Sequence, residues 1–333
     1  MTAQACIATR DGQTGLGDIR LESGEILRDA KVAWRVYGDS TPNEHNVVLM
    51  LPGTSSTRHF ADRFVGEGRA VDPDRWCAIS MDPLGGGGSS RPSDGLWNAF
   101  PAYTIADMTD LQRATLRQSF GINRVSAVCG PSMGAFQALD WAARHGDGVD
   151  RLVLIVPAAR APAKFGSVVD ALEAVLRMGM DASGKPGPLA AHALEAAAKV
   201  MIPWFTAEAH LAETGSQGRE RLAEFSVQRW STDWDPLSLA RRYRASAGFE
   251  GHRMERDDRP VLIIPSVSDT LLPMVEAETL MERFPRAVWQ PMPGKLGHAF
   301  TVVEPGSFHD LWLQRVIAEF LAGESSGESG CDK

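Results

Sequence analysis

Five short stretches of the chain are almost continuously apolar, and polar residues flank each of them. A strand that is covered on both faces carries such a run, whereas a strand with one face in water alternates. Runs of this kind are typical of the central parallel strands of a sheet with helices on both sides. We therefore predict buried strands over 46–51, 76–81, 125–129, 151–156 and 259–265.

Two earlier segments alternate between apolar and polar positions instead. Residues 18–22 and 31–37 follow this pattern, and Ser23-Gly24 supplies a turn after the first. They predict antiparallel strands at one edge of the sheet, and 287–291 predicts its last strand. The polar, glycine-rich lead-in of residues 1–16 is expected to be irregular.

The other segments have helical spacing of apolar residues or helical composition, and they define the domain organisation. Helices are predicted over 103–120, directly after Ser132, and over 276–284 and 307–322; four more are predicted near 165–180, 188–202, 218–229 and 236–247. The fold class is therefore α/β, with a mostly parallel eight-stranded sheet flanked by helices. We predict a core domain over 1–160 and 251–323, a helical lid over 161–250 and a disordered tail over 324–333.

The run over 125–129 leads into Gly130-Pro131-Ser132-Met133-Gly134, and helical spacing follows at once. This order of strand, Gly-x-Ser-x-Gly and helix is typical of the nucleophile elbow of an α/β-hydrolase. Ser132 would stand above the sheet as the nucleophile. The N–H of Met133, at the start of the helix, would point toward a developing oxyanion. The alternative is an ordinary glycine-rich turn, since the motif also occurs by chance.

The loop after the first buried strand reads Pro52-Gly53-Thr54-Ser55-Ser56. In α/β-hydrolases this loop supplies the second N–H of the oxyanion hole. Gly53 or Thr54 would carry that N–H, and the sequence does not choose between them. A plain turn is the alternative reading of this segment.

The residue order of a catalytic triad in this fold is serine, then aspartate or glutamate, then histidine. Asp269 follows the predicted strand over 259–265, and His298 follows the last predicted strand, over 287–291. His298 would take the proton of Ser132, and Asp269 would orient the imidazole. Asp257 and Asp258 are rivals, but they precede the strand and would lie at its other end. The other seven histidines do not combine a loop position with this order.

Composition and charge narrow the classes of partner. The 333 residues carry a formal charge of −8, which disfavours nucleic acid and anionic membranes as partners. No apolar run reaches the roughly eighteen residues of a membrane span, and no secretory signal is visible, so we expect a cytoplasmic protein. Four cysteines without metal-ligand spacing are expected to be reduced, and no metal or cofactor is predicted. The four glycines at 85–88 lack the Lys-Ser/Thr of a phosphate-binding loop and predict an active-site loop.

Four motifs resemble the homoserine O-acetyltransferase family of α/β-hydrolases, within a likeness that runs from about residue 18 to 320. The resemblance implies an acyl-enzyme intermediate on a triad of Ser132, Asp269 and His298, with Met133 as an oxyanion donor. It also implies a helical lid that makes homodimers. The motifs are Asp74-Arg75-Trp76, residues 100–108 (FPAYTIADM), residues 132–141 (SMGAFQALDW) and residues 268–273 (SDTLLP).

The chain departs from the family's pattern where the acyl acceptor would bind. Ala299 stands where the family has an aspartate after the catalytic histidine. The family's lid motif Arg-Phe-Asp-x-Asn-Ser-Tyr reads DWDPLSL at 233–239, without the arginine and tyrosine that hold an amino-acid carboxylate. Ser90-Arg91-Pro92 replaces a Thr-Gly-Pro. Since buried unpaired charge is unfavourable, these losses argue against homoserine as the acceptor.

These observations predict a serine-dependent acyl-transfer enzyme that hydrolyses a small carboxylic ester. One alternative is an O-acyltransferase that uses acyl-CoA as donor and an alcohol as acceptor. Another is a non-catalytic binding protein on the same scaffold, against which the complete triad argues.

The lid is expected to set specificity, because the triad is indifferent to the rest of the substrate. Arg244 is a candidate for binding a substrate anion, since Arg244-Ala245 matches an Arg-Ala pair in the family's lid helix; solvation of Arg241, Arg242 and Arg244 is the alternative. Aromatic residues of the lid could line the cleft or belong to its core: Trp204, Phe205, Trp230 and Trp234.

Overall fold

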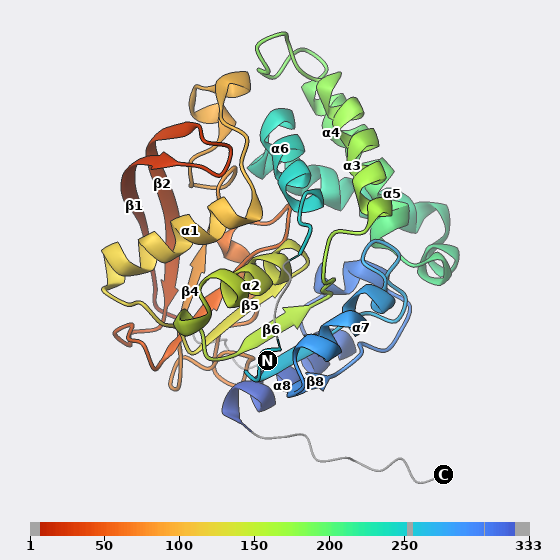
Figure 1. The fold of residues 1–333 in the computed structure, drawn as a ribbon. Helices are drawn as coiled ribbons and strands as arrows, with labels where there is room; N and C mark the ends of the chain where they lie inside the picture. The colour runs from red at the N-terminus through yellow and green to blue at the C-terminus, as the bar shows by residue number, and fades with distance from the viewer. Residues whose placement is uncertain (1–6, 252–255, 303, 324–333) are drawn as a thin grey trace.

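The computed structural model describes residues 7–251, 256–302 and 304–323 (Figure 1). These residues form one eight-stranded sheet of order β1-β2-β4-β3-β5-β6-β7-β8. All eight predicted strands are present, and the predicted fold class is confirmed. The strands are β1 (Thr9–Arg20), β2 (Ile26–Tyr37), β3 (Val47–Met50), β4 (Cys77–Met81), β5 (Ala127–Pro131), β6 (Leu152–Ile155), β7 (Val261–Ile264) and β8 (Ala287–Trp289).

The six strands from β3 to β8 run parallel, whereas β2 pairs antiparallel with both β1 and β4. The five parallel strands from β3 to β7 are short and buried, as their continuous apolar runs predict, whereas β8 is half-buried. Parallel strands bring their carboxyl ends to one edge of the sheet. The loops after β3, β5, β7 and β8 therefore meet there, and these are the loops that carry the predicted site.

The first strand corrects one prediction. β1 begins at Thr9, so the prediction that residues 1–16 are irregular was wrong for residues 9–16. As the edge strand, β1 exposes most of its side chains, and its sequence therefore lacks a clear apolar alternation. Gly12 lies beneath the ring of Trp34 on β2, where an added Cβ would come within 2.2 Å of Cζ2. A glycine that weakens the strand signal is thus required by packing.

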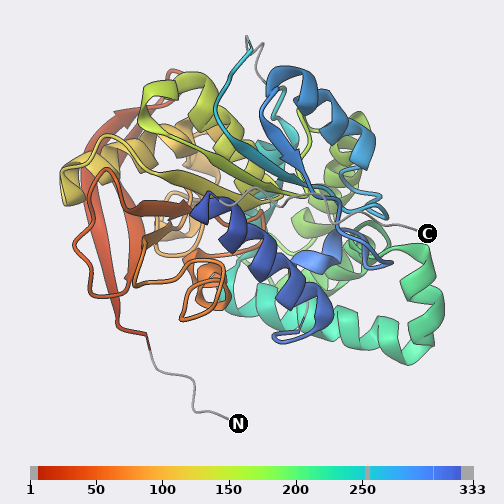
Figure 2. The ribbon, with the colours of Figure 1, turned by 90° about the horizontal axis from the view of Figure 1, so that it is seen from below.

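Helices cover both faces of the sheet, and Figure 2 shows the two groups on opposite sides of the strands. One face lies against α1 (Ile105–Thr115), α2 (Met133–Arg144) and α7 (Met274–Arg283). The other lies against α8 (Phe308–Ala322) and the 3-10 segment Arg58–Arg63.

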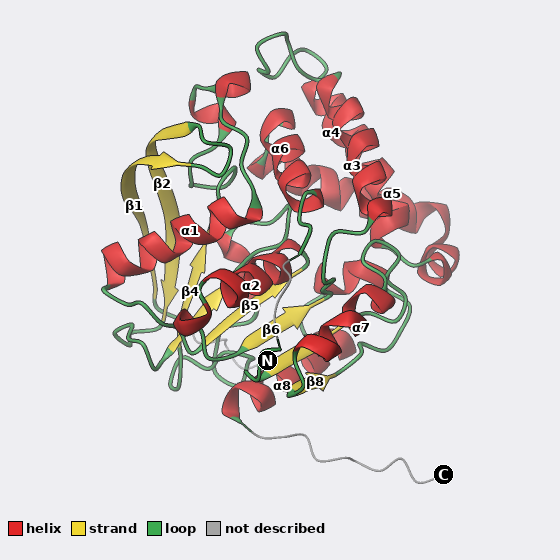
Figure 3. Ribbon diagram, viewed as in Figure 1, coloured by secondary structure: helices red, strands yellow, loops and turns green. Residues whose placement is uncertain are grey.

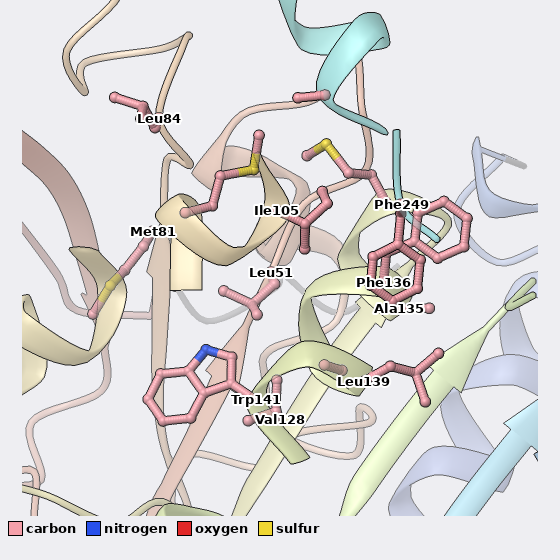
Figure 4. Close-up of a cluster of buried hydrophobic side chains, with 14 of the residues drawn as sticks. Leu51, Met81, Leu84, Ile105, Val128, Ala135, Phe136, Leu139, Trp141 and Phe249 are labelled. Carbon is pink, nitrogen blue, oxygen red and sulfur yellow. The ribbon is translucent and has the colours of Figure 1, made fainter. Parts of the chain in front are cut away.

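Alternate residues of a central strand enter the two cores. In β3, Val47 and Leu49 face the first, and Val48 and Met50 face the second. Figure 4 shows part of the first core, where Phe136 of α2 stacks on Phe249 with ring centroids 4.7 Å apart. This stack packs the start of α2, directly after the predicted nucleophile, against the segment that precedes β7.

Four helices are inserted between β6 and β7, and Figure 3 shows that this part is wholly helix and loop. They are α3 (Ala163–Arg177), α4 (Ala190–Phe205), α5 (Glu208–Asp233) and α6 (Pro236–Ala247). Helix α5 is longer than predicted, and Gly215 breaks it with a φ of 62° and a ψ of −165°. The domain boundaries drawn from the sequence stay predictions, and the predicted tail over 324–333 lies outside the described residues. None of the helices in the described part of the chain is long and apolar enough to cross a membrane.

Candidate active site

Ser132 occupies a strained turn between β5 and α2. Its φ is 56° and its ψ −117°, a backbone conformation that residues other than glycine rarely adopt. The Ser132 N–H donates to the carbonyl of Ile155 on the neighbouring strand, with an N···O distance of 2.9 Å. Strain of this kind persists where the surroundings hold it, and it is common at catalytic sites. The turn has the form expected of a nucleophile elbow.

The two glycines of the motif are required by close backbone approach. A Cβ on Gly130 would lie 2.6 Å from the backbone carbon of Gly134, and a Cβ on Gly134 would lie 2.2 Å from the carbonyl oxygen of Leu51. Real Cβ atoms do not approach other atoms so closely. The glycines of Gly-x-Ser-x-Gly are thus required because α2 packs tightly against β5 and against the end of β3.

The loops after β7 and β8 carry Asp269 and His298, and these two buried side chains meet. Oδ2 of Asp269 lies 2.7 Å from Nδ1 of His298, and Oδ1 accepts hydrogen bonds from the N–H groups of Leu271 (2.8 Å) and Leu272 (2.9 Å). Because a carboxylate only accepts, Nδ1 carries the proton, and the basic lone pair of the imidazole lies on Nε2. The side chain of Asp269 is fully buried, which keeps water from competing for this bond.

Side chains and backbone groups on both sides fix the loop that carries His298. The N–H of Gly297 donates to Oγ of Ser268 (3.0 Å), and that hydroxyl donates to the carbonyl of Gly294 (3.1 Å). Gly297 has a φ of 70°, and a Cβ there would lie 2.7 Å from the backbone nitrogen of Ala207. The loop that carries His298 and the inserted helices therefore touch at this glycine.

The candidate oxyanion donors lie beside Ser132. A Cβ on Gly53 would be 3.8 Å from Cβ of Ser132, so the loop after β3 passes next to this serine. Thr54 is buried, and its hydroxyl donates to Oγ of Ser246 at 3.2 Å. Met133 is the buried first residue of α2. The choice between the N–H groups of Gly53 and Thr54 stays open.

A cavity of about 460 Å³ opens between the sheet and the inserted helices, and both Ser132 and His298 line it. Gly53, Thr54 and Ala299 line it too, and Phe165, Ile202, Phe205, Leu222, Phe225, Trp230 and Tyr243 give it apolar walls. This volume suits a small ligand whose reactive carbon lies at Ser132.

Two residues predicted to bind substrate are not among those that line this cavity. Arg244 lies on α6 and forms ion pairs with Asp170 (2.8 Å) and Glu173. Trp234 is buried against Gly86, where an added Cβ would be 2.2 Å from its ring, and the guanidinium of Arg242 lies over it at 5.1 Å. Of the aromatic lid residues named from the sequence, Phe205 and Trp230 do line the cavity.

Arg229 lines the cavity, and sequence reasoning missed it. Its position follows from the helical spacing of the cavity-facing residues of α5, which are Leu222, Phe225, Ser226, Arg229, Trp230 and Asp233. The predicted helix ended at residue 229, so the last turn of this face was not recognised. The signal that could have found Arg229 is this three- and four-residue spacing, continued to Asp233.

Comparison with known proteins agrees with this architecture. A family model described as alpha/beta hydrolase fold matches residues 46–314. A homoserine O-acetyltransferase of Mycobacterium sp. (strain KMS) is 36% identical over 176 residues, which are 46% of this chain and 47% of that protein. The chain thus matches about half the length of this curated relative.

Solved structures extend the likeness over nearly the whole chain. An acetylester hydrolase from Corynebacterium glutamicum has a TM-score of 0.86 at 19% identity and covers 94% of this chain and 96% of that one. A homoserine O-acetyltransferase from Bacillus anthracis has a TM-score of 0.81 at 20% identity, covering 94% and 97%. At such identities the likeness to these structures shows the fold. The resemblance predicted from the motifs is confirmed by the 36% identical relative. The matched family model covers most of the chain, which therefore belongs to the α/β-hydrolase fold family.

Proposed function

We propose that this chain is a serine-dependent acyl-transfer enzyme that works through an acyl-enzyme on Ser132 and hydrolyses a small carboxylic ester. One observation carries the proposal. Ser132, on a strained elbow, shares a cavity with His298, whose Nδ1 lies 2.7 Å from the buried carboxylate of Asp269. A serine hydroxyl is a weak nucleophile, and it becomes useful where a base is oriented in this way.

In the first half of the reaction, Ser132 is acylated. Nε2 of His298 takes the hydroxyl proton as Oγ bonds to the ester carbon, and the carbonyl π electrons move onto its oxygen. The N–H of Met133, with that of Gly53 or Thr54, stabilises this oxyanion. When the carbonyl re-forms, the bond to the alcohol oxygen breaks, and His298 returns the proton to the departing alcohol.

In the second half, water releases the acyl group. His298 takes a proton from water as the oxygen attacks the acyl carbon, and the same N–H groups stabilise the second oxyanion. Its collapse breaks the bond to Oγ, and His298 reprotonates Ser132. The products are a carboxylic acid, an alcohol and unchanged enzyme.

An O-acyltransferase is the second candidate, because the 36% identical relative is named a homoserine O-acetyltransferase. In that reaction acyl-CoA would acylate Ser132, and an alcohol would replace water in the second half. The cavity presents Ala299 after the catalytic histidine, and the position of the family's lid tyrosine is the fully buried Leu239. Both residues support water over homoserine as the acceptor.

A homodimer through the lid is part of this candidate, and sedimentation of the purified chain tests it.

Intact-protein mass spectrometry after mixing with p-nitrophenyl acetate tests the proposal. We expect a species heavier by one acetyl group, located on the peptide that contains Ser132, present while nitrophenol is released and lost once the ester is exhausted. Ser132→Ala should remain folded and show neither the adduct nor turnover, with a rate lowered by roughly 10⁴-fold or more. An adduct that persists in Ser132→Ala would place the nucleophile elsewhere.

A second measurement separates water from an alcohol as acceptor. Wild-type enzyme is given acetyl-CoA or a simple acetate ester, each with and without candidate alcohols. Rapid turnover of the ester in water alone supports the hydrolase. Consumption of acetyl-CoA that depends on an added alcohol would favour the acyltransferase instead.

A further inference from the structure

Arg229 brings a positive charge to the wall of a mostly apolar cavity. It lies on α5 and is half-buried, and burial lowers the pKa of its guanidinium below the usual arginine range. Its hydrogen-bond acceptor is the neutral hydroxyl of Ser56. Holding a cation away from water is unfavourable unless an anion approaches it, so an anionic group near Arg229 would be stabilising.

The neighbouring carboxylates do not supply that partner. Asp233, one turn further along α5, attracts Arg229 through space, but no described carboxylate lies within ion-pairing distance of the guanidinium. Asp62 accepts hydrogen bonds from Arg35 (3.0 Å) and from the hydroxyl of Tyr37 (2.6 Å). Arg229 therefore keeps an unneutralised charge within the described part of the chain.

The other arginine of the cavity wall shows the contrast. Nη2 of Arg63 lies 2.6 Å from Oδ1 of Asp310, a carboxylate that also accepts the N–H of Gly306 at 2.8 Å. That charge is neutralised within the protein. Of these two arginines, Arg229 is the one whose charge has no ion-pair partner among the described residues.

Ser56 places Arg229 near the reacting centre. It belongs to the same short loop as Gly53, which passes beside Ser132, and the carbonyl of Ser56 accepts a bond of 3.5 Å from the buried Arg242. A ligand held by Arg229 would thus lie in the cavity that contains the nucleophile, against a loop that packing keeps in place.

We propose that Arg229 binds a carboxylate of the substrate, so that the enzyme prefers esters that carry a second, ionised carboxyl group. The guanidinium can hold a carboxylate with two parallel N–H···O bonds, which gives both affinity and orientation. This inference rests on the proposed ester hydrolysis and names its substrate class.

The carboxylate could belong to the acyl part or to the alcohol part of the ester, and matched pairs distinguish them. Monoethyl succinate and its neutral isostere ethyl succinamate place the group on the acyl side. Acetoxyacetate and acetoxyacetamide place it on the alcohol side. We expect wild-type kcat/KM to favour the acidic member of one pair by about tenfold or more, the range of a charged hydrogen bond.

Three variants locate the effect. Arg229→Gln should reduce the acid-to-neutral ratio of kcat/KM about tenfold to a hundredfold, mainly through KM, and Arg229→Lys should restore part of it. Arg244→Gln, which removes the same charge from an ion pair outside the cavity, is the matched control and should keep the wild-type ratio. Melting temperatures identify a variant that has failed to fold; Arg229→Lys then carries the test.

Binding to Ser132→Ala separates this inference from the proposed function, because it requires no turnover. Calorimetry should show that acetoxyacetate or monoethyl succinate binds tighter than its neutral isostere, and that adding Arg229→Gln removes the difference. Equal binding and equal kcat/KM within both pairs would overturn the inference, as would a preference that survives Arg229→Gln. Failure of Ser132 to become acylated by p-nitrophenyl acetate would instead count against the proposed function.

Discussion

Phe205 of α4 stacks on the imidazole of His298, with ring centroids 5.6 Å apart and planes inclined by 15°. The inserted helices thus directly contact the histidine proposed as the catalytic base. The same junction contains Gly297, whose Cβ, if present, would lie 3.0 Å from the carbonyl oxygen of Phe205. The lid that shapes the cavity therefore also limits how the base can move.

We predict that Phe205→Ala lowers kcat for p-nitrophenyl acetate by about tenfold, because an imidazole freed on one face spends less time aligned with Ser132. The loss should appear in kcat more than in KM. Leu189→Ala removes an exposed lid side chain outside the cavity wall and should leave kcat unchanged. Equal loss in both variants would mean that the lid was disturbed as a whole.

The elbow glycine gives a stability prediction with an internal control. Gly134→Ala should destabilise the fold by about 2–4 kcal/mol, since its Cβ would lie 2.2 Å from the carbonyl oxygen of Leu51, a contact that only backbone movement can relieve. Gly166 on α3 has open space around its Cβ position, so Gly166→Ala should stabilise by about 0.5–1 kcal/mol. Urea unfolding measures both. A Gly134→Ala enzyme with wild-type stability would contradict this packing.

Acid should weaken the contact between the edge strands and the loop after β3. Hydrogen bonds from Arg35, aided by Arg58, hold the pKa of Asp11 at about 2, below its ordinary 3.8. A depressed carboxyl pKa contributes stability above the unfolded value, which is lost as the pH falls from about 3.8 toward 2. Because the side chain is 43% exposed, we expect only about 0.5–1 kcal/mol.

The measurement for Asp11 is the difference in unfolding free energy between wild type and Asp11→Asn, followed with pH. The difference should be largest near neutral pH and should shrink below pH 3.8 as wild-type Asp11 becomes protonated. A difference that does not change with pH would show that the charge of Asp11 contributes no stability.

Local sequence constraints explain why the elbow was predictable. Gly130, Ser132 and Gly134 lie within five residues, and steric contacts in the turn require this spacing. Asp269 and His298 followed from the order of strands, since Asp269 lies in the loop after the apolar run of β7 and His298 in the loop after the last strand. Where a feature depends on neighbours in the chain or on strand order, the residues alone carry enough information.

Features that depend on how elements pack together were not predictable in the same way. Which face of a lid helix meets the cavity is decided by its neighbours: α6 turns Arg244 toward Glu173 on α3, whereas α5 turns Arg229 inward. A motif match favoured Arg244, but it carried no information on this rotation. The start of β1 was missed because packing against the Trp34 ring requires a glycine at position 12, and this glycine interrupts the alternating pattern.

The bonds around Asp269 give the sharpest prediction about mechanism. Oδ1 is held by the N–H groups of Leu271 and Leu272, while Oδ2 meets Nδ1 of His298. In Asp269→Asn the amide oxygen can keep the two backbone bonds, but the amide N–H₂ then faces Nδ1. A donor there stabilises the tautomer protonated at Nε2, which cannot accept the proton of Ser132. We expect kcat to fall by about 10⁴-fold with little change in melting temperature.

Asp269→Ala is the matched variant for this test, because it removes the backbone bonds as well as the charge. It should lose activity to a similar extent and also lower the melting temperature, since the N–H groups of Leu271 and Leu272 are left buried without their acceptor. The contrast between the variants separates orientation of the base from support of the loop. If Asp269→Asn kept a rate within about tenfold of wild type, another carboxylate would have to orient His298, and the triad proposed here would be wrong in its third member.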